Sequence, residues 1–277
     1  MLERLKVKVF KANISLVKQR LVIHTWGNAS GRDKATGFIV IKPSGISYNE
    51  MQPDDMVVLD PDGKLVEGKY MPSTDAPTHL LLYRAWNSIG GIVHTHSTYA
   101  TSWAQAGKDI PPLGTTHADH YYGEVPCTRK LSDDETNKEY EVNTGKIIIE
   151  RMNRTDPLAM PSVLVNCHGP FCWGLDPEEA VYNAAALEEI ARMAFYTILL
   201  GNREPLDQYL LRKHHERKHH CDLADGGAGV CGRHEGEAVE DAHREMLARE
   251  LVDPEKVEEE RDREQGFEAR AEGACHE

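Results

Sequence analysis

The 277-residue chain lacks features that mark several classes of protein. No run approaches the roughly 18 consecutive apolar residues that a membrane-spanning helix needs, and residues 1–5 do not resemble the start of a signal peptide. The six cysteines show no framework spacing, and a chain of this length does not depend on disulfides. These absences predict a soluble protein of a reducing compartment, the cytoplasm, with no membrane partner.

An excess of positive charge is also missing. The formal net charge is −13, of which −11 falls in residues 220–277 and only −2 in residues 1–219. A body so close to neutral offers no basic surface for nonspecific binding of nucleic acid. The change in composition predicts a folded domain over residues 1–219 and an acidic, non-matching tail over 220–277. We expect the tail to be partly helical, over 237–251, or disordered.

Helical and strand patterns alternate along the body of the chain. The longest helix has signals at both ends: Asp176 as N-cap, Pro177 at the first helical position, and Gly201 beyond its last turn. The alternation predicts an α/β layered sandwich with a central, mostly antiparallel sheet flanked by helices. Helices are expected over residues 2–18, 77–87, 99–106, 144–151 and 177–200, and strands over 21–26, 37–42, 56–60, 64–70, 91–96 and 163–166.

His94 and His96 are the first candidates for chemistry. In an extended strand their side chains point to one face, and two imidazoles side by side are a good start for a metal site. Such a pair is at least as often an ordinary surface feature, so further ligands are needed. His168 follows an apolar strand and Asp75 precedes a helix. Their simpler interpretations are a turn histidine and a helix N-cap, and Cys167 reads as a small buried apolar group.

Three short segments have the composition of phosphate or polyol loops. Residues 27–31 combine glycine with small polar side chains, residues 42–45 place a lysine beside Ser-Gly, and Ser73-Thr74 precede a helix N-terminus that would favour an anion. Each segment alone is more often an ordinary turn, and none is a Walker loop or a dinucleotide fingerprint.

Taken together, the segments resemble the class II aldolase/epimerase family over residues 1–219. The similarity is strongest to the epimerases of that family, because Asp75 and the Thr116–Asp119 segment differ from the aldolase pattern, which has a glutamate near position 75. The matching segments are Leu21–Asn28, Val40–Gly45, Asp54–Val58, Pro72–His79, Ser88–Ser97, Trp103–Gly107, Gly114–Asp119 and Ile190-Ala191.

The resemblance implies a role for particular residues. Asp75, His94, His96 and His168 match the metal ligands of the family, and the usual metal is zinc. Asp119 matches an acid/base residue of the epimerases, and His214 a C-terminal histidine close to the site. The family is further expected to form homotetramers with active sites between subunits. The implied substrate-binding residues are Gly27, Asn28, Lys42, Ser44, Gly45, Ser73 and Thr74.

The resemblance also implies a reaction, the interconversion of L-ribulose 5-phosphate and D-xylulose 5-phosphate, a step of arabinose catabolism. The C4–H bond is not next to the carbonyl, so simple deprotonation is difficult. The family instead cleaves the C3–C4 bond by a retro-aldol step, which gives an enediolate and glycolaldehyde phosphate. The aldehyde then presents its other face and the bond re-forms, with acid/base help on each face.

The chain departs from the epimerase pattern at its C-terminus. The second acid/base residue of the epimerases resembles a tyrosine about ten residues beyond His214, but no tyrosine follows Tyr209, and the expected position falls near Asp225. Three alternatives follow: a working 4-epimerase, an impaired homologue that binds metal and sugar phosphate, and a class II sugar-phosphate aldolase. A metal-binding appendage is a further interpretation of the tail, through His219, His220, Cys221, Cys231 and His234.

Overall fold

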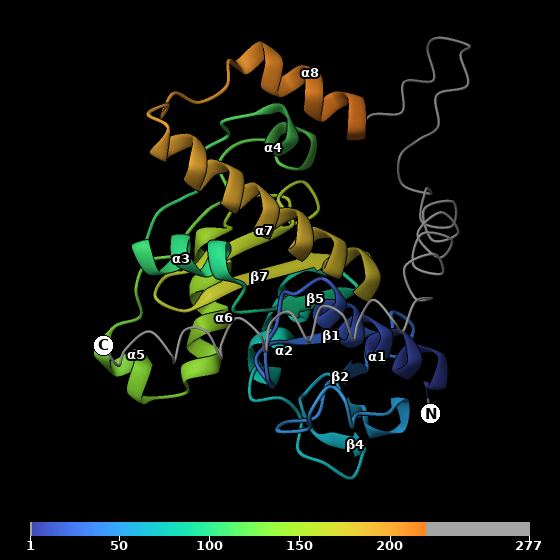
Figure 1. The fold of residues 1–277 in the computed structure, drawn as a ribbon. Coiled ribbons are helices and arrows are strands. Elements are labelled where there is room, and N and C mark those ends of the chain that lie inside the picture. Colours follow the sequence, from blue (N-terminus) through green and yellow to red (C-terminus); the bar gives the residue numbers. More distant parts are fainter. Residues whose placement is uncertain (1, 220–277) are drawn as a thin grey trace, which may run out of the picture. The chain divides into compact units, whose positions relative to one another are not determined.

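An antiparallel sheet of seven strands forms the centre of the structure, a computed structural model that describes residues 2–219 (Figure 1). The strand order is β4-β3-β2-β1-β5-β7-β6, and every pairing is antiparallel. The predicted fold class is therefore confirmed. The strands are β1 (Asn28–Arg32), β2 (Ile39–Ile41), β3 (Val57–Leu59), β4 (Leu65–Glu67), β5 (Gly91–His94), β6 (Ser162–Val165) and β7 (Gly169–Gly174).

Helices cover both faces of the sheet. Neighbouring residues of β1 show this, because their side chains alternate between faces. A side chain at Gly31 would meet Pro177 of α7 and Leu5 of α1, whereas Ser30 bonds to His79 and Tyr83 of α2. The helices are α1 (Glu3–Lys18), α2 (Ala76–Ala85), α3 (Thr98–Ala106), α4 (Thr115–His120), α5 (Asp133–Asn137), α6 (Tyr140–Arg151), α7 (Pro177–Leu199) and α8 (Gln208–His219), with a 3-10 turn at Pro53–Asp55.

The predicted strand over residues 21–26 is wrong, and the true strand β1 begins where a loop was expected. Residues 21–27 are irregular, and Asn28 starts the strand. Small side chains are required here, since α1 and α7 pack closely over Gly31. The amide of Asn13 on α1 also bonds to the backbone of Ala29, donating to its carbonyl and accepting from its N–H. Tertiary packing thus overrides weak strand propensity.

Other boundaries differ in ways that affect the site. Strand β5 ends at His94, so His96 lies just beyond it rather than on it. Strand β7 was not predicted, because the Gly169-Pro170 pair reads as a strand stop. Cys167 is exposed, not buried, with a φ of 63°. Helix α7 begins as predicted, with the Asp176 carboxylate accepting bonds from the backbone N–H groups of residues 178 and 179.

Within residues 2–219, no helix is both long and apolar enough to cross a membrane. The acidic tail over 220–277, its predicted helix and the proposed cluster from His220 to His234 lie outside the described residues, so those predictions stay predictions.

Candidate active site

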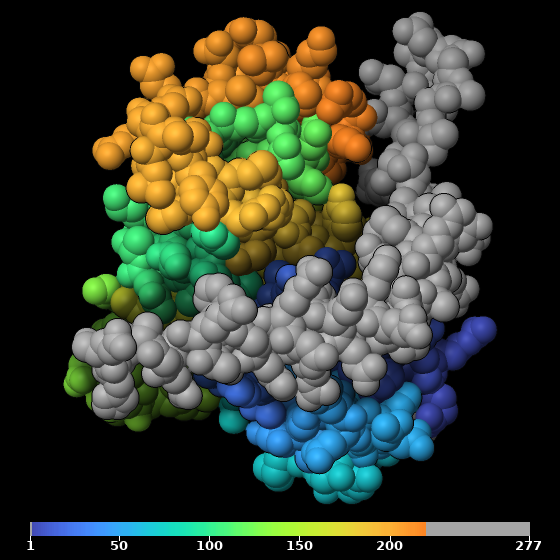
Figure 2. Space-filling view, viewed as in Figure 1, coloured from blue at the N-terminus to red at the C-terminus, as the bar shows by residue number. Residues whose placement is uncertain are grey.

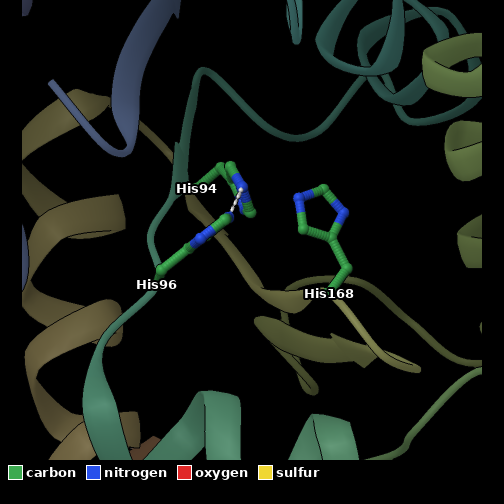
Figure 3. A group of neighbouring side chains, drawn as sticks. All are labelled: His94, His96 and His168. Atoms are coloured by element: carbon green, nitrogen blue, oxygen red, sulfur yellow. Dashed lines mark hydrogen bonds between the residues drawn. The ribbon is translucent and has the colours of Figure 1, made fainter.

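Three histidine side chains converge at one end of the sheet (Figure 3). His94 ends strand β5, His96 follows two residues later, and His168 lies in the turn between β6 and β7. Their ligand nitrogens all lie within 4.8 Å of one another. In the described part of the chain this is the one cluster of three or more such groups with the spacing that a metal ion requires. The structure therefore brings together three of the four predicted metal ligands.

Hydrogen bonding fixes the orientation of His94. Its Nδ1 lies 2.9 Å from the carbonyl oxygen of Pro170, which can only accept, so Nδ1 carries the proton and donates it. The lone pair is then on Nε2, which lies 3.1 Å from Nε2 of His96. The ring of Phe171 also stacks on the imidazole, with a centroid distance of 4.2 Å. His94 is a rigid, single-tautomer imidazole.

The electrostatic environment keeps the cluster uncharged. Burial, with a further contribution from His96, lowers the pKa of His94 to about 3. Burial also lowers the pKa of His168 to about 3, and partial burial lowers that of His96, the most exposed of the three. A neutral imidazole is the form that binds a metal ion. Three neutral imidazoles whose ring nitrogens face one another fit a divalent metal such as zinc, which would take the place of the 3.1 Å hydrogen bond between His94 and His96.

Asp75 lies beside the cluster but is not part of it. Its side chain makes no cap bond to α2, although it occupies the N-cap position. Instead, Oδ2 accepts a 2.7 Å hydrogen bond from the amide of Asn28. Asn28 in turn pairs with His94 across the sheet, which places the carboxylate beside the cluster, where its charge partly offsets the lowering of the pKa of His96 and His168 by burial. The simple N-cap interpretation is thus wrong for the side chain.

The predicted phosphate segments form one continuous surface next to the cluster. The chain around Lys42 runs antiparallel to the chain before α2: the N–H of Ser44 donates to the carbonyl of Met71, and the N–H of Ser73 to that of Lys42, each at 2.9 Å. Asn28 joins this surface to the cluster, because its amide donates to Ser73 Oγ at 3.0 Å and its Cα pairs with that of His94. We call residues 27–28, 42–45 and 73–74 the platform.

The platform has groups suited to a polar ligand. The buried amide oxygen of Asn28 has no hydrogen-bond partner among the described residues. Thr74, Ser44 and Gly45 are exposed, and Gly45 has a φ of 71° with open space around it. Gly27 has a φ of 86°, and a side chain there would lie 2.7 Å from the carbonyl oxygen of His94, so only glycine suits the position.

Lys42 supplies the positive charge of the platform. Its ammonium is buried and donates to the carbonyls of Pro43 and Ile46 at 3.2 and 3.1 Å. It also lies 4.9 Å from the ring centre of Tyr48, whose hydroxyl donates to the carbonyl of Gly27. Burial lowers the pKa of Lys42. A desolvated cation next to the exposed Ser44 and Gly45 is well placed to attract an anion.

Asp119 and His214 form a second group, on α4 and α8. His214 Nδ1 lies 3.0 Å from Asp119 Oδ1, and Arg217 donates to both carboxylate oxygens at 3.0 and 3.1 Å. On the face drawn in Figure 2, the atoms of α4 are bordered by those of α7 and α8, the helices against which α4 packs. No described contact joins this group to the histidine cluster or to the platform.

Some residues of the site were not found from the sequence. Tyr140 contacts His168, Arg217 pairs with Asp119, and Phe171 supports His94. Phe171 could have been found had β7 been predicted, because a strand paired with β5 places it opposite His94. Tyr140 and Arg217 lie far along the chain from their partners, and no local pattern marks them.

Comparison with known proteins places the chain in context. A model of the Class II Aldolase and Adducin N-terminal domain matches residues 7–195. The L-ribulose-5-phosphate 4-epimerase UlaF of Salmonella paratyphi A is 54% identical over 219 residues, which cover 79% of this chain and 96% of the relative. The protein of the same name from Salmonella typhi matches with the same values. A solved L-fuculose 1-phosphate aldolase superposes with a TM-score of 0.67 at 27% identity, over 77% of this chain and 95% of that one.

Proposed function

Because the chain belongs to the class II aldolase and adducin N-terminal domain family, we propose that it is a metal-dependent L-ribulose-5-phosphate 4-epimerase. It interconverts L-ribulose 5-phosphate and D-xylulose 5-phosphate by breaking and re-forming the C3–C4 bond. The convergence of three neutral imidazoles beside the platform carries the proposal, since it unites a metal site with an anion site. The relatives of 54% identity that bear this name favour an epimerase over an aldolase.

The histidine cluster would hold the metal through the Nε2 atoms of His94, His96 and His168. Asp75 is the proposed fourth ligand, because its carboxylate accepts a hydrogen bond from Asn28, the residue that pairs with His94. Zinc suits three imidazoles and a carboxylate. When bound, it supplies Lewis-acid stabilisation of the negative charge that develops on the substrate oxygens during cleavage.

The platform would bind the phosphate end of the substrate. Ser44 and Thr74 present hydroxyls and Gly27 and Gly45 present backbone without a side chain, while Asn28 and Ser73 connect them to the cluster. The buried ammonium of Lys42 adds a positive charge. Holding the phosphate also holds glycolaldehyde phosphate after cleavage, so that the aldehyde can present its other face without leaving. This retention distinguishes epimerisation from a net aldol cleavage.

Asp119 is the proposed acid/base residue, with His214 and Arg217 orienting its carboxylate. In one subunit this group makes no described contact with the cluster, so the active site would be completed by Asp119 of a neighbouring subunit. A homotetramer with sites between subunits satisfies this requirement. The separation of the two groups within one chain supports that arrangement.

An apolar surface on α7 is the proposed contact between subunits. Its large side chains are exposed by 38–88%, and several recur at helical spacing on one side of α7. Exposure of so many large apolar groups on one element is unfavourable in an isolated subunit, because burial of apolar area is the main driving force of association. The surface consists of Tyr182, Met193, Phe195, Tyr196 and Leu199 of α7, with Leu200 at its C-cap.

Replacing Leu199 with aspartate should therefore lower the oligomeric state. Leu199 is 66% exposed, so the folded subunit tolerates the change, whereas a buried carboxylate in a subunit contact is costly. Light scattering after gel filtration should show a smaller species, and turnover should fall with it. Leu65→Asp, on the opposite end of the sheet at β4 and 47% exposed, is the matched control. A tetrameric mass for Leu199→Asp, or a monomeric mass for the unaltered chain, would contradict the arrangement.

Product analysis tests the epimerase against the aldolase. The zinc-loaded protein is incubated with L-ribulose 5-phosphate, and both D-xylulose 5-phosphate and free glycolaldehyde phosphate are measured. The epimerase proposal predicts D-xylulose 5-phosphate with little free aldehyde. Accumulation of glycolaldehyde phosphate and dihydroxyacetone without D-xylulose 5-phosphate would assign an aldolase instead.

A further inference from the structure

One tyrosine contacts the histidine cluster from outside. Tyr140 is the first residue of α6, and its hydroxyl lies 3.4 Å from Nδ1 of His168. The two rings are tilted by 45°, with centroids 5.9 Å apart. In Figure 3, one ring nitrogen of His168 faces His94 and His96 and the other faces away. Since Nδ1 meets Tyr140, Nε2 is the nitrogen directed into the cluster.

This geometry determines which nitrogen of His168 carries the proton when a metal is bound. A ligand nitrogen must offer its lone pair, so ligation through Nε2 requires the proton on Nδ1. The Tyr140 oxygen is then the acceptor for Nδ1–H, just as the Pro170 carbonyl is for His94. Such outer partners fix ring orientation and tautomer, and they make the imidazole a better ligand.

The backbone on both sides of the contact is unusual. Glu139, which precedes Tyr140, has a φ of 49°, and Cys167, which precedes His168, has a φ of 63°. Neither is a glycine, and non-glycine residues seldom adopt this left-handed conformation. Residues held in such conformations cluster at functional sites because the surrounding structure fixes them there. Here the two unusual residues immediately precede the two partners.

We propose that Tyr140 is a positioning residue, whose hydroxyl holds His168 in the tautomer and orientation that bind the metal. The inference rests on the proposed metal site but not on the identity of the substrate. It assigns no contact between Tyr140 and the reacting atoms.

The variant Tyr140→Phe tests this inference, because it keeps the half-buried ring and removes only the hydroxyl. Zinc affinity of the full chain is measured by competition with a chromophoric chelator, and thermal unfolding is measured with and without zinc. We expect the dissociation constant for zinc to rise by about 10- to 100-fold, the usual cost of losing an outer partner. The metal-free unfolding temperature should not change, whereas the stabilisation produced by zinc should shrink.

Tyr99→Phe is the matched control, since Tyr99 also loses one hydroxyl contact, a 2.9 Å bond to Tyr196 on the surface of α3 and α7. It should bind zinc like the unaltered chain. Unchanged affinity in Tyr140→Phe would overturn the inference, and so would a loss of affinity matched by an equal loss of metal-free stability, which assigns Tyr140 to packing. If the unaltered chain binds no zinc, the proposed metal site is refuted. That result differs from the two outcomes for Tyr140→Phe, which concern only the role of Tyr140.

Discussion

Replacing His96 with asparagine should remove most of the bound zinc and the activity together. His96 supplies one of the three converging ring nitrogens, and the shorter asparagine side chain offers none in its place. Loss of an outer partner alone weakens metal affinity by about 10- to 100-fold, so loss of a ligand should weaken it by more than about 100-fold. Zinc content after desalting, measured by atomic emission, and the rate of D-xylulose 5-phosphate formation report the two effects.

His24→Asn is the matched control for that change. His24 lies near the same loop, with its ring centroid 5.7 Å from that of Trp26, but outside the cluster. Its φ of 52° is a conformation that asparagine adopts readily. The control should keep full zinc content. If His96→Asn also kept it, His96 would have to be removed from the ligand set.

Replacing Asp119 with asparagine should reduce turnover by about 100-fold or more, the usual contribution of a general acid/base group. Asparagine has the same shape, so the oxygen that faces Arg217 and His214 can remain in place while the ionisable group is lost. Zinc content should be unchanged, because no described contact joins Asp119 to the cluster, and oligomeric mass should be unchanged, because asparagine keeps the size of the side chain. The measurement is the steady-state rate of epimerisation at saturating substrate.

A second carboxylate paired with arginine provides the comparison. Asp109 accepts a 2.8 Å bond from Arg151, and no described contact joins it to the cluster, to the platform or to Asp119. Asp109→Asn should leave the rate nearly unaltered even if it lowers stability. Full activity in Asp119→Asn would exclude Asp119 as the acid/base residue.

Strand positions predicted that His94 and His96 lie together, whereas His168 joined them as a ligand only through the resemblance to the family. His94 and His96 were expected on one face of a strand, and His168 at the end of another. The rings do meet, although His96 lies beyond β5. The platform was predicted in pieces, yet its continuity was not, because it depends on pairing between residues 42–45 and 71–74. Local patterns do not carry that information.

Local sequence patterns also failed to predict strands β1 and β7. Strand β1 is built from small and polar residues that only close helix packing explains, and β7 opens with a glycine and a proline that normally end a strand. The exposed conformation of Cys167 follows from the turn that presents His168. Membership of the family, by contrast, was predicted from many collinear segments and is confirmed.

The absence of a tyrosine after Tyr209 bears on the rate rather than on the fold. The epimerases resembled by this chain use a C-terminal tyrosine as a second acid/base group, and the acidic tail replaces that segment. Epimerisation uses one acid/base group on each face of the aldehyde. Without the tyrosine, one face lacks its group. We therefore expect the natural chain to be slower than one that carries the tyrosine.

Epimerisation by two forms of the chain decides whether it is a 4-epimerase. The zinc-loaded full-length chain is compared with a variant in which the residues after His219 are replaced by a tyrosine-bearing C-terminus from an epimerase of the family. Both are given L-ribulose 5-phosphate, with zinc content measured in parallel. We predict that both proteins form D-xylulose 5-phosphate, and that the tyrosine-bearing variant forms it faster. If neither protein forms D-xylulose 5-phosphate while each holds one zinc ion per subunit, the chain is not a 4-epimerase.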